Sequence, residues 1–484
     1  MATNAKTRRE PMSRVDTAWL RMERATNLMM ITGVMMFDEP ITLDRLKRIV
    51  KQRFLAYPRF RQKAVDAPTG ALWEDDVDFD LDWHVRLTAL PGRGGKRELE
   101  RLSGQLASTP LDKTKPLWQF HLVERYDGGS ALITRIHHCY ADGIALVQVL
   151  LSLTDTTREA KPGSDLAKAW LKQDGQKVAE RVTGINRAVQ FGERMLEKGM
   201  EMYRDPSLAG VLAREGGEIA RELGHALSLS DDPPTVLRGR LGVSKRVAWA
   251  DPLDLEEVKA ISRAFDCTVN DVLMATAAGA LRSYLLERGE ALDGKTIRAT
   301  VPVNLRPLEH ARKLGNHFGL VFLELPIGEP NPVTRLHRVA ACMEQLKTSR
   351  QAIVAYGLLA AMGLAPPAVQ RTALELFSRK ATAVATNVPG PQMPLFLAGS
   401  TIREMMFWVP QTGSIGVGIS ILSYNGRVHF GLIGDARLMP DPDAVIRRFR
   451  PEFEKLLYVG LMADWDSCVS SQDADAVVNG DRVA

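Results

Sequence analysis

Cysteine is scarce in this sequence, and so are aromatic side chains. The four cysteines lie far apart in 484 residues, and no two have the Cys-x-x-Cys spacing of a zinc or redox site. So few thiols do not make a disulfide scaffold, which favours a reducing compartment. Aromatic residues make up 6% of the chain, a low share for an all-β protein that reads sugars or bases.

An excess of one charge is also missing. Lys and Arg number 63 against 58 Asp and Glu, a net charge of +5, and the basic residues form no clustered stripe. Nucleic-acid-binding proteins normally carry such a stripe, so we predict no nucleic-acid partner. Neither a Gly-x-Gly-x-x-Gly turn between a strand and a helix nor a Walker A motif occurs. Nucleotide-dependent redox and phosphoryl-transfer chemistry are therefore not supported.

No hydrophobic run predicts a membrane span. Residues 352–369 carry no charge, but Pro366 and Pro367 interrupt them. The part before the prolines would form only ~21 Å of helix, against a hydrocarbon core of ~30 Å. Residues 1–11 are polar and basic, unlike a secretory signal. We expect a cytoplasmic protein with a buried helix in 352–369; peripheral contact with the inner membrane or with lipid inclusions is the alternative.

Composition and periodicity divide the chain into five parts. The ranges are a flexible arm over 1–12, a mixed α/β lobe over 13–155, a helical connector over 156–234, a second mixed lobe over 235–462, and a polar tail over 463–484. The connector is rich in Lys, Glu, Arg and Ala and has helical spacing.

Apolar patterns predict the elements of each lobe. In the first lobe, strands are expected at 28–37, 117–124 and 131–138, and helices at 41–56 and 144–153. In the second lobe, helices are expected at 255–265 and 271–288, and strands at 296–303, 319–325, 415–424 and 427–433. The dipeptide Asn425-Gly426 between the last two strands predicts a tight hairpin.

One segment carries a pattern typical of catalysis. A strand ends in His137 and His138, and Asp142-Gly143 then leads into a helix. Histidine is the usual general base near neutral pH. Metal binding is disfavoured because successive strand side chains point to opposite faces, and no third ligand clusters nearby. The alternative is a pair of core histidines with Asp142 capping the helix; Gly143 would permit the tight turn.

The motif His137-His138-x-x-x-Asp142-Gly143 is the signature of the CoA-dependent acyltransferase superfamily. Within it, the chain resembles the bacterial wax ester synthase/diacylglycerol acyltransferase family. The resemblance extends from about residue 13 to 461. It rests on further matches in the same order: Trp73-Glu74-Asp75, Pro116-Leu117-Trp118, Asn270-Asp271, Val301-Pro302-Val303-Asn304-Leu305-Arg306, Gly315-Asn316, Asn387-Val388-Pro389-Gly390-Pro391 and Ser423-Tyr424-Asn425-Gly426.

The resemblance implies a fold and an activity. The fold would be α/β, with two chloramphenicol-acetyltransferase-like lobes of mixed sheets around a central tunnel. The enzyme would transfer a long acyl group from acyl-CoA, a co-substrate and not a bound cofactor, to a long-chain alcohol (giving wax ester) or to diacylglycerol. His138 would be the general base, with His137 beside it. The alternatives are another thioester donor or acceptor, and a non-catalytic lipid-binding protein of storage droplets.

Two further residues are candidates at the site. Asn270 would contact a substrate oxygen, although Thr268 and Asp271 around it also fit a helix capping box. Arg306 would form an ion pair with Asp142 that ties the lobes together, as in relatives of the superfamily; the alternative is an ordinary arginine at a strand end.

Four more residues are candidates for the tunnel wall: Trp118, Asn387, Pro389 and Gly390. For Trp118, packing in the core is the favoured interpretation. The turn that contains Asn387, Pro389 and Gly390 would shape the tunnel or the CoA entrance, or act only as a rigid turn.

Overall fold

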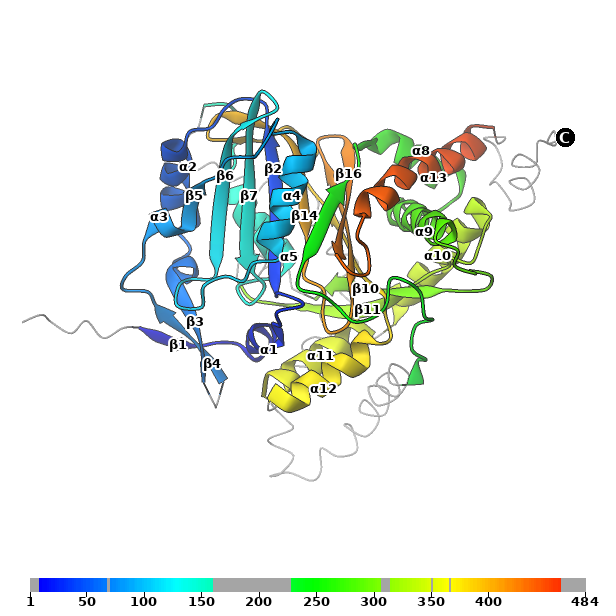
Figure 1. Cartoon of the computed structure of the whole chain (residues 1–484), viewed down its shortest axis with the longest axis horizontal. Coiled ribbons are helices and arrows are strands. Elements are labelled where there is room, and N and C mark those ends of the chain that lie inside the picture. Colours follow the sequence, from blue (N-terminus) through cyan, green and yellow to red (C-terminus); the bar gives the residue numbers. More distant parts are fainter. Residues whose placement is uncertain are drawn as a thin grey trace, which may run out of the picture.

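The structure is a computed structural model, and it describes residues 8–67, 70–159, 228–305, 314–349, 351–364 and 367–462 (Figure 1). The predicted connector lies outside the described residues except at its two ends, as does the predicted tail, 463–484. Arg306 also lies outside them. The described strands form one small and two large sheets, and the mixed α/β class is confirmed.

The first large sheet has six strands and holds the histidine motif at its centre. Strand β7 lies between β2 and β6, and every residue of β7 is buried. Both faces of the sheet are therefore covered, and the buried residues of β7 include the polar Ser130, Thr134, Arg135 and His137. The strands, in spatial order, are β13 (Phe396–Leu397), β14 (Ser400–Trp408), β2 (Met30–Phe37), β7 (Gly129–His137), β6 (Trp118–Tyr126) and β5 (Val85–Leu87).

The second large sheet has seven strands. In spatial order they are β11 (Phe318–Leu325), β10 (Ile297–Asn304), β12 (Ala383–Pro389), β15 (Val417–Tyr424), β16 (Arg427–Asp435) and β8 (Lys245–Trp249), and β9 (Leu253–Asp254) pairs with β16. The predicted hairpin is confirmed: Asn425 and Gly426 both have positive φ, 49° and 72°, as a type I′ turn requires.

The two lobes are not separate in sequence. Strand β14 belongs to the predicted second lobe, yet it pairs antiparallel with β2 in the first sheet, Met405 opposite Met35 and Phe407 opposite Gly33. Its last residue, Trp408, contacts Trp249 of the second sheet, with ring centroids 5.9 Å apart. The chain therefore crosses between the sheets, and the boundary of the first lobe is not a single point in the sequence.

Helices cover both sheets and the space between them (Figure 1). Beside the first sheet lie α2 (Leu43–Ile49), α3 (Leu81–His84), α4 (Lys96–Ala107) and α5 (Gly143–Ser152). Beside the second lie α8 (Leu255–Ala264), α9 (Val269–Glu287), α10 (Pro332–Thr348) and α13 (Pro442–Met462). The remaining three pack together: α1 (Arg14–Met22) lies against α11 (Gln351–Leu364) and α12 (Pro367–Ser378).

Two local predictions differ from the structure. Residues 9–11, predicted as part of a flexible arm, form strand β1 (Arg9–Pro11), because it pairs with β4 (Gly70–Asp75), which also pairs with β3 (Gln62–Ala67). The helix predicted over 41–56 ends as an α-helix at Ile49 and continues as a π-helical turn over Val50–Phe54.

Candidate active site

The histidine motif forms a short loop between β7 and α5. Strand β7 ends at His137, and α5 begins at Gly143. Asp142 is the N-cap of α5, as predicted: its Oδ1 accepts a hydrogen bond from the Ala145 N–H at 2.9 Å. The cap fixes the end of the loop and leaves His138 at its start, where its N–H donates to the Met29 carbonyl at 2.7 Å.

His138 lies between two aromatic rings. Its imidazole stacks on Trp19, with ring centroids 4.2 Å apart and planes 17° from parallel, and Phe318 lies 5.5 Å away. Burial lowers the pKa of His138 to about 4, although the charge of Asp142 acts in the opposite direction. The ring is therefore neutral at pH 7. Its Nδ1 is enclosed by protein and makes no hydrogen bond with the described residues.

His137 faces the other way. Its Nδ1 accepts a hydrogen bond from the Cys139 N–H at 3.1 Å, and its Nε2 lies 3.2 Å from a Glu23 carboxylate oxygen. Burial opposes the charge of Glu23, but His137 and Lys113 outweigh it and lower the pKa of Glu23 to about 2. These contacts of His137 with Cys139 and Glu23 stabilise the loop. Burial also raises the pKa of the neighbouring Cys139 thiol, which makes it a poor nucleophile.

Three cavities adjoin one another near the histidine loop, and His138 lines the middle one. The central cavity, about 780 Å³ including space open to solvent, is lined from both sheets, with His138, Asp142, Thr300, Phe318 and Thr386 among its residues. The α11 cavity, about 840 Å³, adjoins it and is lined by α11, α12 and part of α1. The α5 cavity, about 740 Å³, is lined by α5, β2 and β14.

Shared residues show how the cavities connect. Trp19 and Leu320 line both the central and the α11 cavity, and Gly143 and Phe407 line both the central and the α5 cavity. A Cβ at Gly143 would meet no atom within 4 Å, and its φ is not positive. The backbone therefore does not require a glycine here, contrary to the prediction that Gly143 permits a tight turn.

A segment of the second lobe holds the histidine loop in place. The Asn316 side chain donates to the His138 carbonyl at 2.8 Å, and the His317 N–H donates to Asp142 Oδ2 at 3.0 Å. Asp16 of α1 accepts from both the backbone and the side-chain N–H groups of Asn316, at 3.0 and 2.7 Å. Burial raises the pKa of Asp16 to about 6. Asn316 was noted in the sequence only as a motif match, and Asp16 and Trp19 were not noted.

The structure places the predicted site residues differently. Asn270 is exposed and does not line the three cavities; its Oδ1 accepts a hydrogen bond of 2.5 Å from Asn387, which does line the central cavity. The capping box of Thr268 and Asp271 is present. The predicted ion pair of Asp142 with Arg306 cannot be placed, because Arg306 lies outside the described residues.

Of the candidates for the tunnel wall, Asn387 and Gly390 line a cavity, whereas Pro389 and Trp118 do not. Gly390 lines the α5 cavity, where a Cβ would lie 2.5 Å from the Ser423 carbonyl oxygen. Pro389 is exposed, and Trp118 is fully buried in the core, where it stacks on His84 at 4.3 Å and donates to the Phe60 carbonyl at 2.8 Å. Neither lines the three cavities, so Trp118 packs in the core.

Thr386 is a candidate that the sequence analysis missed. It precedes Asn387 on β12, lines the central cavity, and is 3% exposed. Its Oγ1 makes no hydrogen bond with the described residues. A buried hydroxyl without a partner is a donor available to a ligand. Its position directly before the quoted motif, which begins at Asn387, was the one available signal.

Neither a metal site nor a membrane span is present among the described residues. No group of three His, Cys, Asp or Glu side chains there is arranged to hold a metal ion. Within the same ranges, every helix is too short or too polar to span a bilayer.

Two domains of one protein family match most of the chain. Residues 12–273 match the wax ester synthase/diacylglycerol acyltransferase catalytic domain, and residues 314–457 match the C-terminal domain of the same family. The chain belongs to this family. It is accordingly an acyl-CoA-dependent O-acyltransferase, as the sequence analysis expected.

Similar proteins agree in sequence and in fold. A probable diacylglycerol O-acyltransferase of Mycobacterium tuberculosis is 30% identical over 415 residues, which cover 84% of this chain and 85% of the relative. A putative one of the same species is 28% identical over 470 residues, covering 93% and 90%. Among solved structures, the wax ester synthase/diacylglycerol acyltransferase from Marinobacter aquaeolei superposes with a TM-score of 0.65 at 24% identity, covering 93% of this chain and all of the other.

The fold extends beyond the family. The starter condensation domain of rhizomide synthetase superposes with a TM-score of 0.55 at 13% identity, over 94% of each chain. The two-lobed acyltransferase architecture expected from the resemblance is thereby shown.

Proposed function

We propose that this enzyme transfers a long-chain acyl group directly from acyl-CoA to the hydroxyl of a long-chain alcohol or of diacylglycerol, with His138 as general base. The observation that supports it most is the position of His138. It is a buried, neutral imidazole, and it lines the middle one of three adjoining cavities whose walls are mainly apolar. Such walls accept alkyl chains from either side, and the base lies where two chain ends meet.

The reaction needs only groups that the central cavity provides. His138 Nε2 takes the proton from the acceptor hydroxyl as its oxygen bonds to the thioester carbonyl carbon, and the carbonyl electrons move onto its oxygen. Thr386 donates its free hydroxyl to this oxyanion. The carbon–sulfur bond then breaks, and the CoA sulfur takes the proton from His138. A positioned base accelerates such a step by about 10²–10⁴-fold, and no acyl-enzyme is needed.

The substrates are poorly soluble, and the enzyme's surface offers a place for them to arrive. Helix α12 contributes Leu374 and Phe377 to the α11 cavity, while Val369 and Leu376 on the same helix are exposed. Exposed apolar side chains beside an apolar cavity favour contact with a lipid surface. We therefore place the enzyme in the cytoplasm, at the surface of the inner membrane or of lipid inclusions.

Release of free CoA tests the proposed function. Palmitoyl-CoA would be supplied with hexadecanol, with dipalmitoylglycerol, or with no acceptor, each presented in phospholipid vesicles, and thiol release would be followed with a chromogenic reagent. We expect release that depends on an acceptor hydroxyl. Equal release without acceptor would indicate a thioesterase. Silence in every well with folded protein would contradict acyl-CoA as the donor.

The pH dependence tests the state of His138. Because its pKa in the folded enzyme is about 4, the base is unprotonated at pH 5.5 as at pH 7.5, and we expect kcat/KM to lose little over that range. The stability of the fold, unlike kcat/KM, is expected to change with pH. A histidine whose pKa is lowered on folding binds fewer protons than in the unfolded chain, so stability falls as pH falls from about 6.5 toward 4. Brief assays with a folding check separate the two effects; a decline in kcat/KM centred near pH 6.5 would contradict the assignment.

A further inference from the structure

Trp19 forms the wall between the central and the α11 cavity, and its indole N–H has no partner. The side chain is 3% exposed and lines both cavities. One face of the ring stacks on His138. Its Nε1 makes no hydrogen bond with the described residues. A buried indole N–H usually has an acceptor, so this donor calls for a ligand oxygen.

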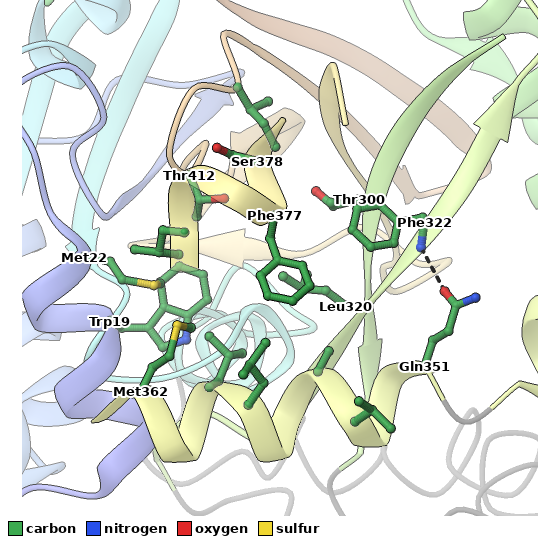
Figure 2. A pocket seen from close by; sticks show the side chains of 16 residues that line it. Trp19, Met22, Thr300, Leu320, Phe322, Gln351, Met362, Phe377, Ser378 and Thr412 are labelled. Atoms are coloured by element: carbon green, nitrogen blue, oxygen red, sulfur yellow. Dashed lines mark hydrogen bonds between the residues drawn. The ribbon is translucent and has the colours of Figure 1, made fainter. Parts of the chain in front are cut away.

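The surroundings of Trp19 supply no such oxygen. Figure 2 shows the indole beside Met22 and Met362, at one end of the α11 cavity. The other polar side chains around this cavity are those of Thr300, Gln351, Ser378 and Thr412, and none of them bonds the indole N–H. The indole N–H is thus a buried donor that the protein leaves free.

The α5 cavity on the other side of His138 differs in this respect. Its polar side chains are Thr134 and Thr154, and their hydroxyls donate to the carbonyls of Gly33 and Leu151. It therefore offers a chain only apolar contacts, and such contacts distinguish one alkyl chain from another weakly. A buried donor that needs an acceptor discriminates much more strongly against a ligand without one.

We propose, resting on the function proposed above, that Trp19 is a specificity-determining residue whose indole N–H binds an ester carbonyl oxygen of diacylglycerol while the free hydroxyl of that acceptor lies at His138. Diacylglycerol carries its ester groups a few covalent bonds from the reacting hydroxyl. The stack, with centroids 4.2 Å apart, places the indole ring directly beside the imidazole. A long-chain alcohol has no ester oxygen and leaves the donor unpaired.

An ether analogue of the acceptor tests this directly. Dipalmitoylglycerol and 1,2-di-O-hexadecylglycerol have the same hydroxyl and two long chains, but the ether lacks both carbonyls. With palmitoyl-CoA as donor, we expect the wild-type enzyme to favour the ester by about tenfold in kcat/KM. In Trp19→Phe, which keeps an aromatic ring and removes the N–H, we expect the ester-to-ether ratio to approach one. Phe318→Leu is the matched control, because it alters the other ring beside His138 without touching a polar group; its ratio should stay as in the wild type, whatever its rate.

The outcomes separate this inference from the proposed function. An unchanged ratio in Trp19→Phe would overturn the role of the N–H, and so would equal use of ester and ether by the wild type. The wild-type comparison needs no variant, so it decides the matter even if Trp19→Phe fails to fold. A wild-type enzyme that releases CoA with hexadecanol but is indifferent to the ester would overturn only the role of Trp19. No release with any acceptor would overturn the function itself.

Discussion

Replacing His138 by alanine is expected to abolish acyl transfer in a chain that still folds. Removing a positioned general base lowers kcat by about 10²–10⁴-fold. The fold should persist because the loop is held through the backbone of residue 138, whose N–H donates to the Met29 carbonyl and whose carbonyl accepts from Asn316, and alanine keeps both groups. The measurements are the rate of CoA release with palmitoyl-CoA and an acceptor, and the midpoint of thermal unfolding.

His429→Ala is the matched control. His429 is also buried, and desolvation is the main cause that lowers its pKa to about 4. It lies on β16 and lines none of the three cavities. Truncation at either site opens a hole in the interior, so both variants should lose some stability. Only His138→Ala should lose turnover. Near-normal turnover in His138→Ala would remove the imidazole from the mechanism, and equal losses in both variants would point to a general effect of truncation.

The parts of the site that could be predicted are those written in consecutive residues. The strand that ends at His137, the cap made by Asp142 and the hairpin at Asn425 each depend on neighbours within a few positions, so periodicity and capping rules suffice. Strand parity predicted that only one histidine of the pair would face a substrate. It did not distinguish His137 from His138, because that choice depends on which face of β7 the cavity occupies.

Contacts between distant segments escaped the sequence analysis. Asp16 meets Asn316 across 300 positions, and the stack of Trp19 on His138 joins helix α1 to the end of β7. An amphipathic pattern shows that α1 has a buried face, but not what that face touches. The expected contact of Asn270 with a substrate stays a prediction: its helix and cap were readable from the sequence, whereas its exposure is set by how α9 packs in the second lobe.

The crossing of β14 shows the same limit for the fold. The sequence analysis predicted no strand over 400–408, and a strand pattern alone carries no label for the sheet that it joins. Position in the chain placed 400–408 in the second lobe, while pairing with β2 places it in the first sheet. The consequence reaches the site, because Phe407 of this strand lines both the central and the α5 cavity.

Replacing Thr386 by valine is expected to lower kcat by about 10²-fold with little change in KM. The loss follows from removing a donor aimed at charge that develops only in the transition state, and single oxyanion donors are worth about 10²–10³ in kcat. Valine has nearly the shape of threonine, so packing on β12 is kept. Thr386→Ser keeps the hydroxyl and should retain most of the activity. Steady-state kinetics with varied palmitoyl-CoA and acceptor would measure both constants.

Stability then separates a catalytic hydroxyl from a structural one. In the free enzyme the Thr386 hydroxyl is buried without a partner, and burying an unpaired polar group costs free energy. Thr386→Val should therefore unfold at the same temperature as the wild type or at a higher one, while its turnover falls. A structural threonine would give the opposite pair of results, lower stability with turnover retained, and that outcome would contradict the role in the oxyanion site. A protein that keeps such a cost in its resting state gains from it only when the oxyanion forms.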